Sequence, residues 1–129
     1  MQLQLLREPF CICRLEANEP VPDWATGAFV SVTRTPDELS IVCPESTLPE
    51  AGLPLSVKSE PGWRCLKTVG PFQFSEVGIV ASLASPLAAA GVPIFVISTF
   101  DTDWLLIQQP FLETAIRTLE AAHHSVEQL

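Results

Sequence analysis

The chain of 129 residues is 47% hydrophobic and 17% charged, a composition typical of globular domains, which excludes a disordered or low-complexity protein. Its 15 acidic and 7 basic residues give a formal net charge of −8, which would repel a phosphate backbone or an anionic membrane surface. We therefore expect neither nucleic acid nor a membrane as a partner.

The N-terminal residues lack a basic head followed by a long apolar run, and no stretch reaches the roughly 18 apolar residues of a membrane span. These features predict a cytoplasmic protein. Thiols stay reduced in that compartment, so we expect no disulfide among the four cysteines, which are Cys11, Cys13, Cys43 and Cys65. No metal or other cofactor is expected, because the pair Cys11 and Cys13 lacks two further ligands at zinc-binding spacing. The adjacent His123 and His124 are predicted to be solvated.

Short runs of β-branched and aromatic residues in the first half of the chain predict strands. Residues 3–16 are predicted to form a strand or bent hairpin interrupted at Pro9, and residues 28–33 and 39–43 to form two further strands. Three prolines and a glycine leave room only for a short turn in residues 44–54. Residues 55–60 are predicted to form a strand that leads into Pro61 and Gly62.

The second half begins with a predicted half-buried strand at residues 63–69, followed by a helix at residues 75–90. Ser75 is the candidate N-cap of this helix, and Gly91 closes it. Pro86 should kink the last turn, where the hydroxyl of Ser82 or Ser85 could satisfy the freed carbonyl. The apolar stripe of the helix consists of Val80, Leu83, Ala84, Leu87 and Ala88.

Two short apolar runs, residues 93–98 and 104–107, predict a hairpin that is buried on at least one face. Pro110 suits the first position of a second amphipathic helix, predicted at residues 110–122, and residues 125–129 supply a short final strand. We expect the side chains that face the core to be Val80, Leu83, Leu87, Ile116 and Leu119.

From Trp63 onward the predicted order is β, α, β, β, α, β, which is the ferredoxin-like α+β arrangement. This order places both helices on one face of a four-stranded antiparallel sheet. The first half repeats the strands with its helices eroded, so we expect two such units in tandem. Their expected bounds are residues 1–60 for the N-terminal half and residues 61–129 for the C-terminal domain.

Two motifs, Val77-Gly78-Ile79-Val80 and Ser98-Thr99-x-x-Thr102-Asp103, together with the strand at residues 63–69, resemble the ACT-domain family. The chain is most similar to the tandem subgroup shared by aspartate kinase regulatory domains and cytosolic arginine sensors. The resemblance implies a regulatory, allosteric protein that binds a free amino acid, with arginine and lysine as the cationic candidates. It also implies a homodimer formed through sheet edges or helices.

By this resemblance Gly78 matches a glycine that lets the ligand approach the backbone, and Asp103 matches an acidic residue that faces the ligand side chain in the arginine sensors. The residues themselves support such a site, since a helix start offers backbone N–H groups to a carboxylate, and a tight turn with an acidic residue can meet a cation. The candidate ligand-binding residues are Ser75, Glu76, Val77, Gly78, Ile79, Val80, Ser98, Thr99, Thr102 and Asp103.

The same residues also fit purely structural roles: Gly78 in close packing of helix on sheet, Asp103 in capping a turn, and Ser75 as an N-cap. An enzyme is not expected, because the sequence holds no nucleophile with a base, no metal-ligand cluster and no phosphate-binding loop. The alternative to an amino-acid-binding protein is a dimerisation or interaction module that binds no ligand.

Overall fold

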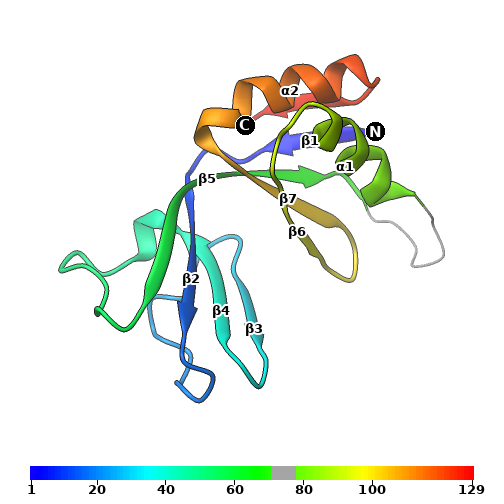
Figure 1. The fold of residues 1–129 in the computed structure, drawn as a ribbon. Coiled ribbons are helices and arrows are strands. Elements are labelled where there is room, and N and C mark those ends of the chain that lie inside the picture. The colour runs from blue at the N-terminus through cyan, green and yellow to red at the C-terminus, as the bar shows by residue number, and fades with distance from the viewer. Residues whose placement is uncertain (71–77) are drawn as a thin grey trace. The chain divides into compact units, whose positions relative to one another are not determined.

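The computed structural model describes residues 1–70 and 78–129 (Figure 1). The described residues form a mixed α+β fold with eight strands and two α-helices, which confirms the predicted class. The chain divides into two compact units, which are described separately below. We call residues 8–63 the strand unit and residues 1–7 with 64–129 the helical unit.

The strand unit is an antiparallel sheet whose strands lie in the order β3-β4-β2-β5. Buried residues alternate along β2, where Cys11 lies directly opposite Cys43 of β4. One face of the sheet carries a core of Cys11, Cys13, Leu15, Leu39, Ile41 and Cys43. The elements of the unit are β2 (Phe10–Leu15), β3 (Ser31–Arg34), β4 (Leu39–Pro44), the 3-10 turn η1 (Glu45–Thr47) and the first part of β5 (Lys58–Thr68).

The strand β5 corrects one prediction, because residues 55–60 and 63–69 do not form two strands on either side of Pro61 and Gly62. A single strand runs from Lys58 to Thr68, and a shift of register against β2 accommodates one extra residue at this point. Gly62 adopts a φ of 81°, the conformation that such a bulge favours in glycine, and its N–H donates to Glu45 Oε2 at 2.7 Å. The bulge therefore lets the strand continue through two residues that usually end one.

The helical unit contains the βαββαβ order in its last six regular elements. Its sheet order is β8-β1-β5-β7-β6, so β1 from the N-terminus lies between β5 and β8 and pairs with β8 in parallel. The predicted four-stranded antiparallel sheet is therefore wrong. Its elements are β1 (Gln2–Leu5), the second part of β5, α1 (Ile79–Ala89), β6 (Phe95–Ser98), β7 (Asp103–Gln108), the 3-10 turn η2 (Gln109–Phe111), α2 (Leu112–Ala121) and β8 (Ser125–Gln128).

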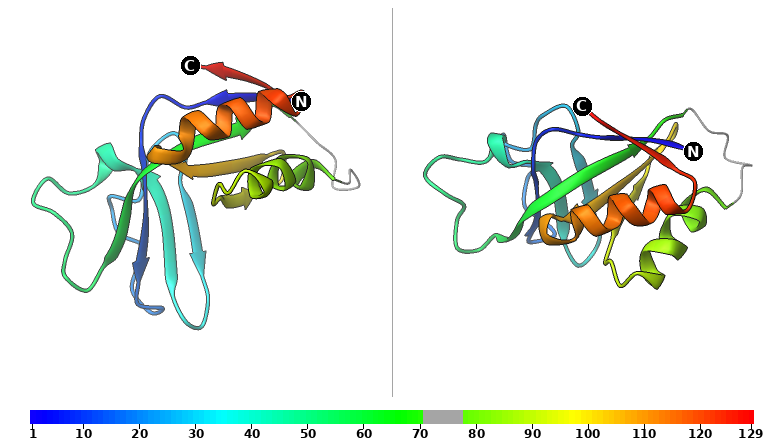
Figure 2. Two further views of the ribbon diagram at one scale, coloured as in Figure 1. Left: turned by 45° about the horizontal axis from the view of Figure 1, so that its top comes forward. Right: turned by 90° about the horizontal axis from the view of Figure 1, so that it is seen from above.

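Both helices of this unit pack on the same face of the sheet, as predicted (Figure 2). Leu83, Leu87 and Leu119 are fully buried, whereas Val80 and Ile116 are only half-buried, because Val80 lies in the first turn of α1 and Ile116 lies at the side of the apolar stripe of α2. The buried core consists of Leu3, Leu5, Leu66, Leu83, Leu87, Val92, Leu105, Ile107, Leu112, Ala115 and Leu119.

Pro86 lies inside α1, where it has no N–H to donate to the carbonyl of Ser82. His124 Nε2 donates to that carbonyl oxygen at 3.1 Å, while the Ser82 hydroxyl donates to Ile79 O at 2.8 Å. The freed carbonyl is therefore satisfied by a histidine ring and not by a serine hydroxyl. His124 is half-buried, so the prediction that it is a solvated tail residue is wrong.

Candidate functional site

Four chain segments of the helical unit meet at one end of its sheet. β5 ends there at Thr68, and α1 begins there after a connection that includes residues 71–77. β6 ends and β7 begins at the same end, because the hydroxyl of Thr68 contacts the turn between these two strands. The predicted ligand-binding residues that the structure describes, from Gly78 onward, belong to these segments.

A buried pair of threonines ties β5 to the β6–β7 turn. Thr68 is fully buried and Thr102 is 9% exposed, and their hydroxyl oxygens lie 2.5 Å apart. The Thr102 hydroxyl donates to Thr68 O at 2.6 Å, while Thr68 Oγ1 accepts the N–H of Asp103 at 3.0 Å. The position of Asp103 is thus set by a hydrogen bond from its own backbone to β5.

Thr68 is not among the residues predicted for the site. Thr68 lies directly opposite Leu3, so it occupies a position of β5 that faces the core. A hydroxyl at a core-facing position of an apolar strand needs a partner, since burying it unpaired costs roughly 1–3 kcal/mol. The core-facing position of Thr68 in the sequence therefore indicates that its hydroxyl has a hydrogen-bond partner. The sequence does not show that this partner lies in the β6–β7 turn.

The turn itself is closed by Thr99, whose N–H and hydroxyl both donate to Thr102 O, at 2.8 and 2.9 Å. Phe100 and Asp101 form its exposed tip. The structure therefore brings together four of the predicted residues, Ser98, Thr99, Thr102 and Asp103, in one hydrogen-bonded hairpin end.

The carboxylate of Asp103 is buried at this hairpin end, where the residue is 9% exposed. Ser98 pairs directly with Asp103, and its hydroxyl donates to Asp103 Oδ1 at 2.5 Å. Asp103 alternates with the core residues Leu105 and Ile107 along β7, so its side chain lies on the face that the helices cover. Within residues 1–70 and 78–129 no Lys, Arg or His forms an ion pair with it.

The start of α1 is formed by Gly78, Ile79 and Val80. Gly78 is the N-cap with a φ of 78°, and Ile79 and Val80, the first two residues of the helix, are half-buried. The first N–H groups of a helix have no partner within it. Among the described atoms none lies within 4 Å of a Cβ added to Gly78, so close packing against the described residues does not explain this glycine. A positive φ does, since residues with a side chain rarely adopt it.

The remaining predicted site residues, Ser75, Glu76 and Val77, lie outside the described residues. The described helix runs from Ile79 with Gly78 as its N-cap, and the predicted N-cap Ser75 lies outside the described residues. A polar side chain just before a helical pattern is a common N-cap signal, but a glycine with positive φ can replace it.

Two further features are absent from residues 1–70 and 78–129. No three His, Cys, Asp or Glu side chains in that part are grouped so that they could hold a metal ion. The two helices found there are too short to cross a membrane.

Comparisons with known proteins bear on both units. A family model described as an ACT domain matches residues 58–121, and a second family model, described as an N-terminal domain, matches residues 8–51. The cytosolic arginine sensor for mTORC1 subunit 1 of Bos taurus is 33% identical over 108 residues, which cover 81% of this chain. The human protein of the same name is 32% identical over 108 residues. The chain spans only 33% of the length of these curated relatives.

Solved structures of other proteins are also similar to this chain. An X-ray structure of a protein from Agobacterium tumefaciens is 46% identical, with a TM-score of 0.88 over 99% of this chain and 92% of that one. The regulatory subunit of aspartate kinase from Thermus thermophilus, in its ligand-free form, is 13% identical with a TM-score of 0.61, over 89% of this chain and 93% of that one, which shows a shared fold. The family match shows that residues 58–121 are an ACT domain, and these likenesses agree with it.

Proposed function

We propose that this protein is a regulatory ACT protein without catalytic activity, and that it binds a free amino acid between the start of α1 and the β6–β7 turn. The buried carboxylate of Asp103 carries the proposal. A buried charge is costly unless a cation and hydrogen bonds compensate it, and the described residues provide a hydrogen bond but no cation. A cationic group of a ligand would supply that partner.

The start of α1 supplies the complementary half of the site. Its unpaired backbone N–H groups and the positive end of the helix dipole favour a carboxylate. Gly78 leaves the approach to these N–H groups open among the described atoms. Because a free amino acid carries a carboxylate and an ammonium group, one molecule would engage both halves of the site.

Arginine is the first amino acid to test. The curated relatives are named as cytosolic arginine sensors, and the net charge of −8 favours a cationic ligand. With a guanidinium, Asp103 would form a charge-assisted pair that a neutral side chain could not form. Lysine is the second cationic candidate.

The tandem arrangement and the assembly belong to the same proposal. Residues 1–60 would be an ACT-like half with reduced helices, and residues 61–129 the ACT domain that carries the site. Pairing of two copies through sheet edges or helices would give a homodimer, as is common for sheets with open edges. We also propose a cytoplasmic location, because the sensor relatives are named as cytosolic proteins.

The experiment is a thermal-shift screen of the protein against the twenty amino acids at millimolar concentration. A ligand raises the unfolding temperature because it adds RT ln(1 + [L]/Kd) to the free energy of unfolding. We expect arginine or lysine to give the largest shift. If no amino acid shifts the transition, the proposal fails and the interaction module without a ligand becomes the better account.

A matched pair of variants then tests the assigned residue. Asp103→Asn keeps an oxygen for the Ser98 hydroxyl but removes the charge, and should weaken binding by about ten- to a hundredfold, since a charged hydrogen bond contributes roughly 1.5–3 kcal/mol. Asp101→Asn removes a charge from the exposed tip of the same turn and should leave the affinity unchanged. Equal affinities for both variants would remove Asp103 from the site.

A further inference from the structure

The strand unit contains a cavity that the amino-acid site does not use. Its volume is about 330 Å³, which is within the range of small-molecule pockets. Leu15 and Val57 line it on the side of the unit's core, and Trp24 lines it together with Pro20 and Pro22. Aromatic and proline side chains provide apolar walls that lose little conformational entropy when a ligand binds.

The loop that forms one side of the cavity is held by backbone hydrogen bonds. Glu19 N donates to Glu16 O at 3.1 Å, and Thr26 N donates to Trp24 O at 2.8 Å. The guanidinium of Arg34 donates to Ala17 O, which anchors the loop to β3. The walls are thus positioned by the fold before any ligand arrives.

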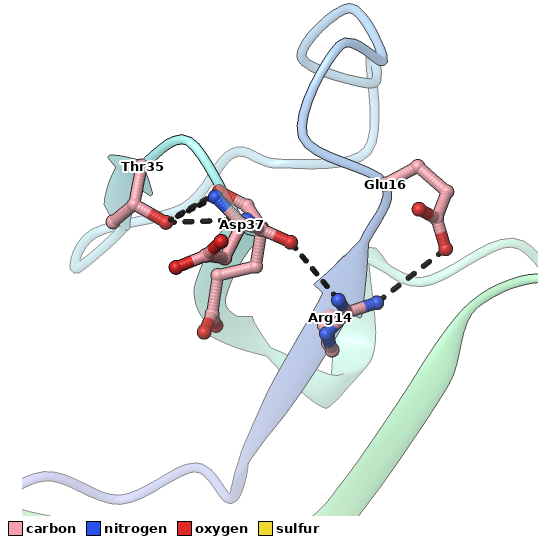
Figure 3. A network of polar contacts seen from close by, with 5 residues as sticks. Arg14, Glu16, Thr35 and Asp37 are labelled. Carbon is pink, nitrogen blue, oxygen red and sulfur yellow. Dashed lines mark hydrogen bonds and ion pairs between the residues drawn. The ribbon is translucent and has the colours of Figure 1, made fainter.

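Two carboxylates, those of Glu16 and Glu19, belong to the lining and are exposed. Arg14 Nη1 lies 3.5 Å from Glu16 Oε1, and Arg14 Nη2 donates to Asp37 O at 3.0 Å, so the Glu16 carboxylate is held toward the β3–β4 turn (Figure 3). Within the described part of the chain Glu19 forms no ion pair. Two negative charges against one positive charge leave the lining of the cavity net negative.

A second cavity in the same unit shows that the charge is particular to the first. This second cavity has a volume of about 390 Å³, and its lining contains leucines, prolines and the Cys11 thiol but no charged residue. The two cavities share Pro54 and Val57. An apolar ligand could bind in either cavity, whereas a cationic ligand would bind preferentially in the first cavity.

We propose that the cavity lined by Trp24, Glu16 and Glu19 is a second ligand site, and that it takes a guanidinium or ammonium group carried on a short aliphatic stem. The stem lies against the proline and tryptophan walls, and the cationic group meets the Glu19 carboxylate at the mouth. A tryptophan ring also attracts a cation near its face. This site is independent of the amino-acid site, because it lies in the other unit and requires no carboxylate on its ligand.

The test uses n-butylguanidinium as the probe and N-butylurea, its neutral isostere, as the matched control ligand. Binding is followed by NMR through the indole N–H resonance of Trp24 at constant ionic strength. We expect a saturable shift of this resonance with the cation and binding at least tenfold weaker with the urea. Glu19→Gln should weaken the cation by about two- to fivefold, the range for an exposed ion pair.

Glu120→Gln is the control variant, because it removes the same charge from an exposed position of α2 in the helical unit. It should leave the affinity unchanged. A capped peptide with one arginine identifies the source of the cation: equal binding indicates a protein side chain, and weaker binding indicates a small molecule. The inference is overturned if Trp24 shows no saturable shift, if the urea binds equally well, or if Glu120→Gln weakens binding as much as Glu19→Gln.

Discussion

Replacement of Thr68 by valine tests whether the buried hydroxyl pair fixes the candidate site. Valine has the shape of threonine without the hydroxyl, so the packing of β5 against Leu3 is retained. The N–H of Asp103 loses its acceptor, while the Thr102 hydroxyl keeps its bond to Thr68 O. A buried N–H without a partner costs about 1–3 kcal/mol, so we expect the free energy of unfolding to fall by this amount.

For a chain of this size a loss of 1 kcal/mol corresponds to a fall of about 4 °C in the unfolding temperature, which gives about 4–12 °C for Thr68→Val. Chemical denaturation measures the same quantity as a lower midpoint at unchanged slope. The control is Thr33→Val on the exposed face of β3, which should change stability by less than about 0.5 kcal/mol. If the two variants were equally stable, the hydroxyl of Thr68 would not hold the turn.

Three further predictions follow from the packing and the backbone. Leu83→Ala leaves a cavity between α1 and the sheet and should cost about 2–5 kcal/mol in denaturant unfolding, whereas a loss below 1 kcal/mol would contradict the assigned core. Burial raises the pKa of the Cys65 thiol to about 12, above its usual value of 9.0. The folded protein then keeps a proton that the unfolded chain releases, so this contribution to stability is complete below pH 9 and is lost as the pH rises toward 12; Cys65→Ala should show a smaller alkaline loss. Gly62→Ala forces a residue with a side chain into a φ of 81° and should lower the free energy of unfolding by about 1–2 kcal/mol, measured by thermal unfolding. Gly70→Ala is the control, because Gly70 is not among the glycines with a positive φ.

The sequence predicted the helical unit well because its signals are local. The helices and the β6–β7 hairpin follow from periodicity and from proline and glycine positions within each segment. The insertion of β1 between β5 and β8 does not, although Gln2-Leu3-Gln4-Leu5 alternates as a half-buried strand should. Alternation shows that a strand has one buried face, but it does not identify the strands with which it pairs.

Two of the corrections have a common physical cause, which is that a distant side chain satisfies a local defect. Pro61 and Gly62 would normally end a strand, but Glu45 accepts the N–H of Gly62 and the strand continues. Pro86 frees a carbonyl in α1, and His124 from the far end of the chain donates to it. Neither partner is close in sequence, so neither could be deduced from the segment in which the defect lies.

Only those residues of the candidate site that are neighbours in the sequence were predicted. Ser98, Thr99, Thr102 and Asp103 are neighbours in the sequence, and their grouping in one turn followed from the hairpin. Thr68 joins them only through the fold. The cavity beside Trp24 also depends on two separate loops, at Glu16 to Trp24 and at Pro54 to Val57, which local patterns do not bring together.

The central claim is that an amino acid binds at the end of the helical unit where α1 and β7 begin. Its most direct test is an NMR titration of the ¹⁵N-labelled protein with the amino acid that gives the largest thermal shift. We predict saturable changes at the amides of Ile79 and Val80 and of the hairpin end from Ser98 to Asp103, and their loss in Asp103→Asn. Saturable changes confined to residues 8–63, with these amides unchanged, would contradict the assignment of the site.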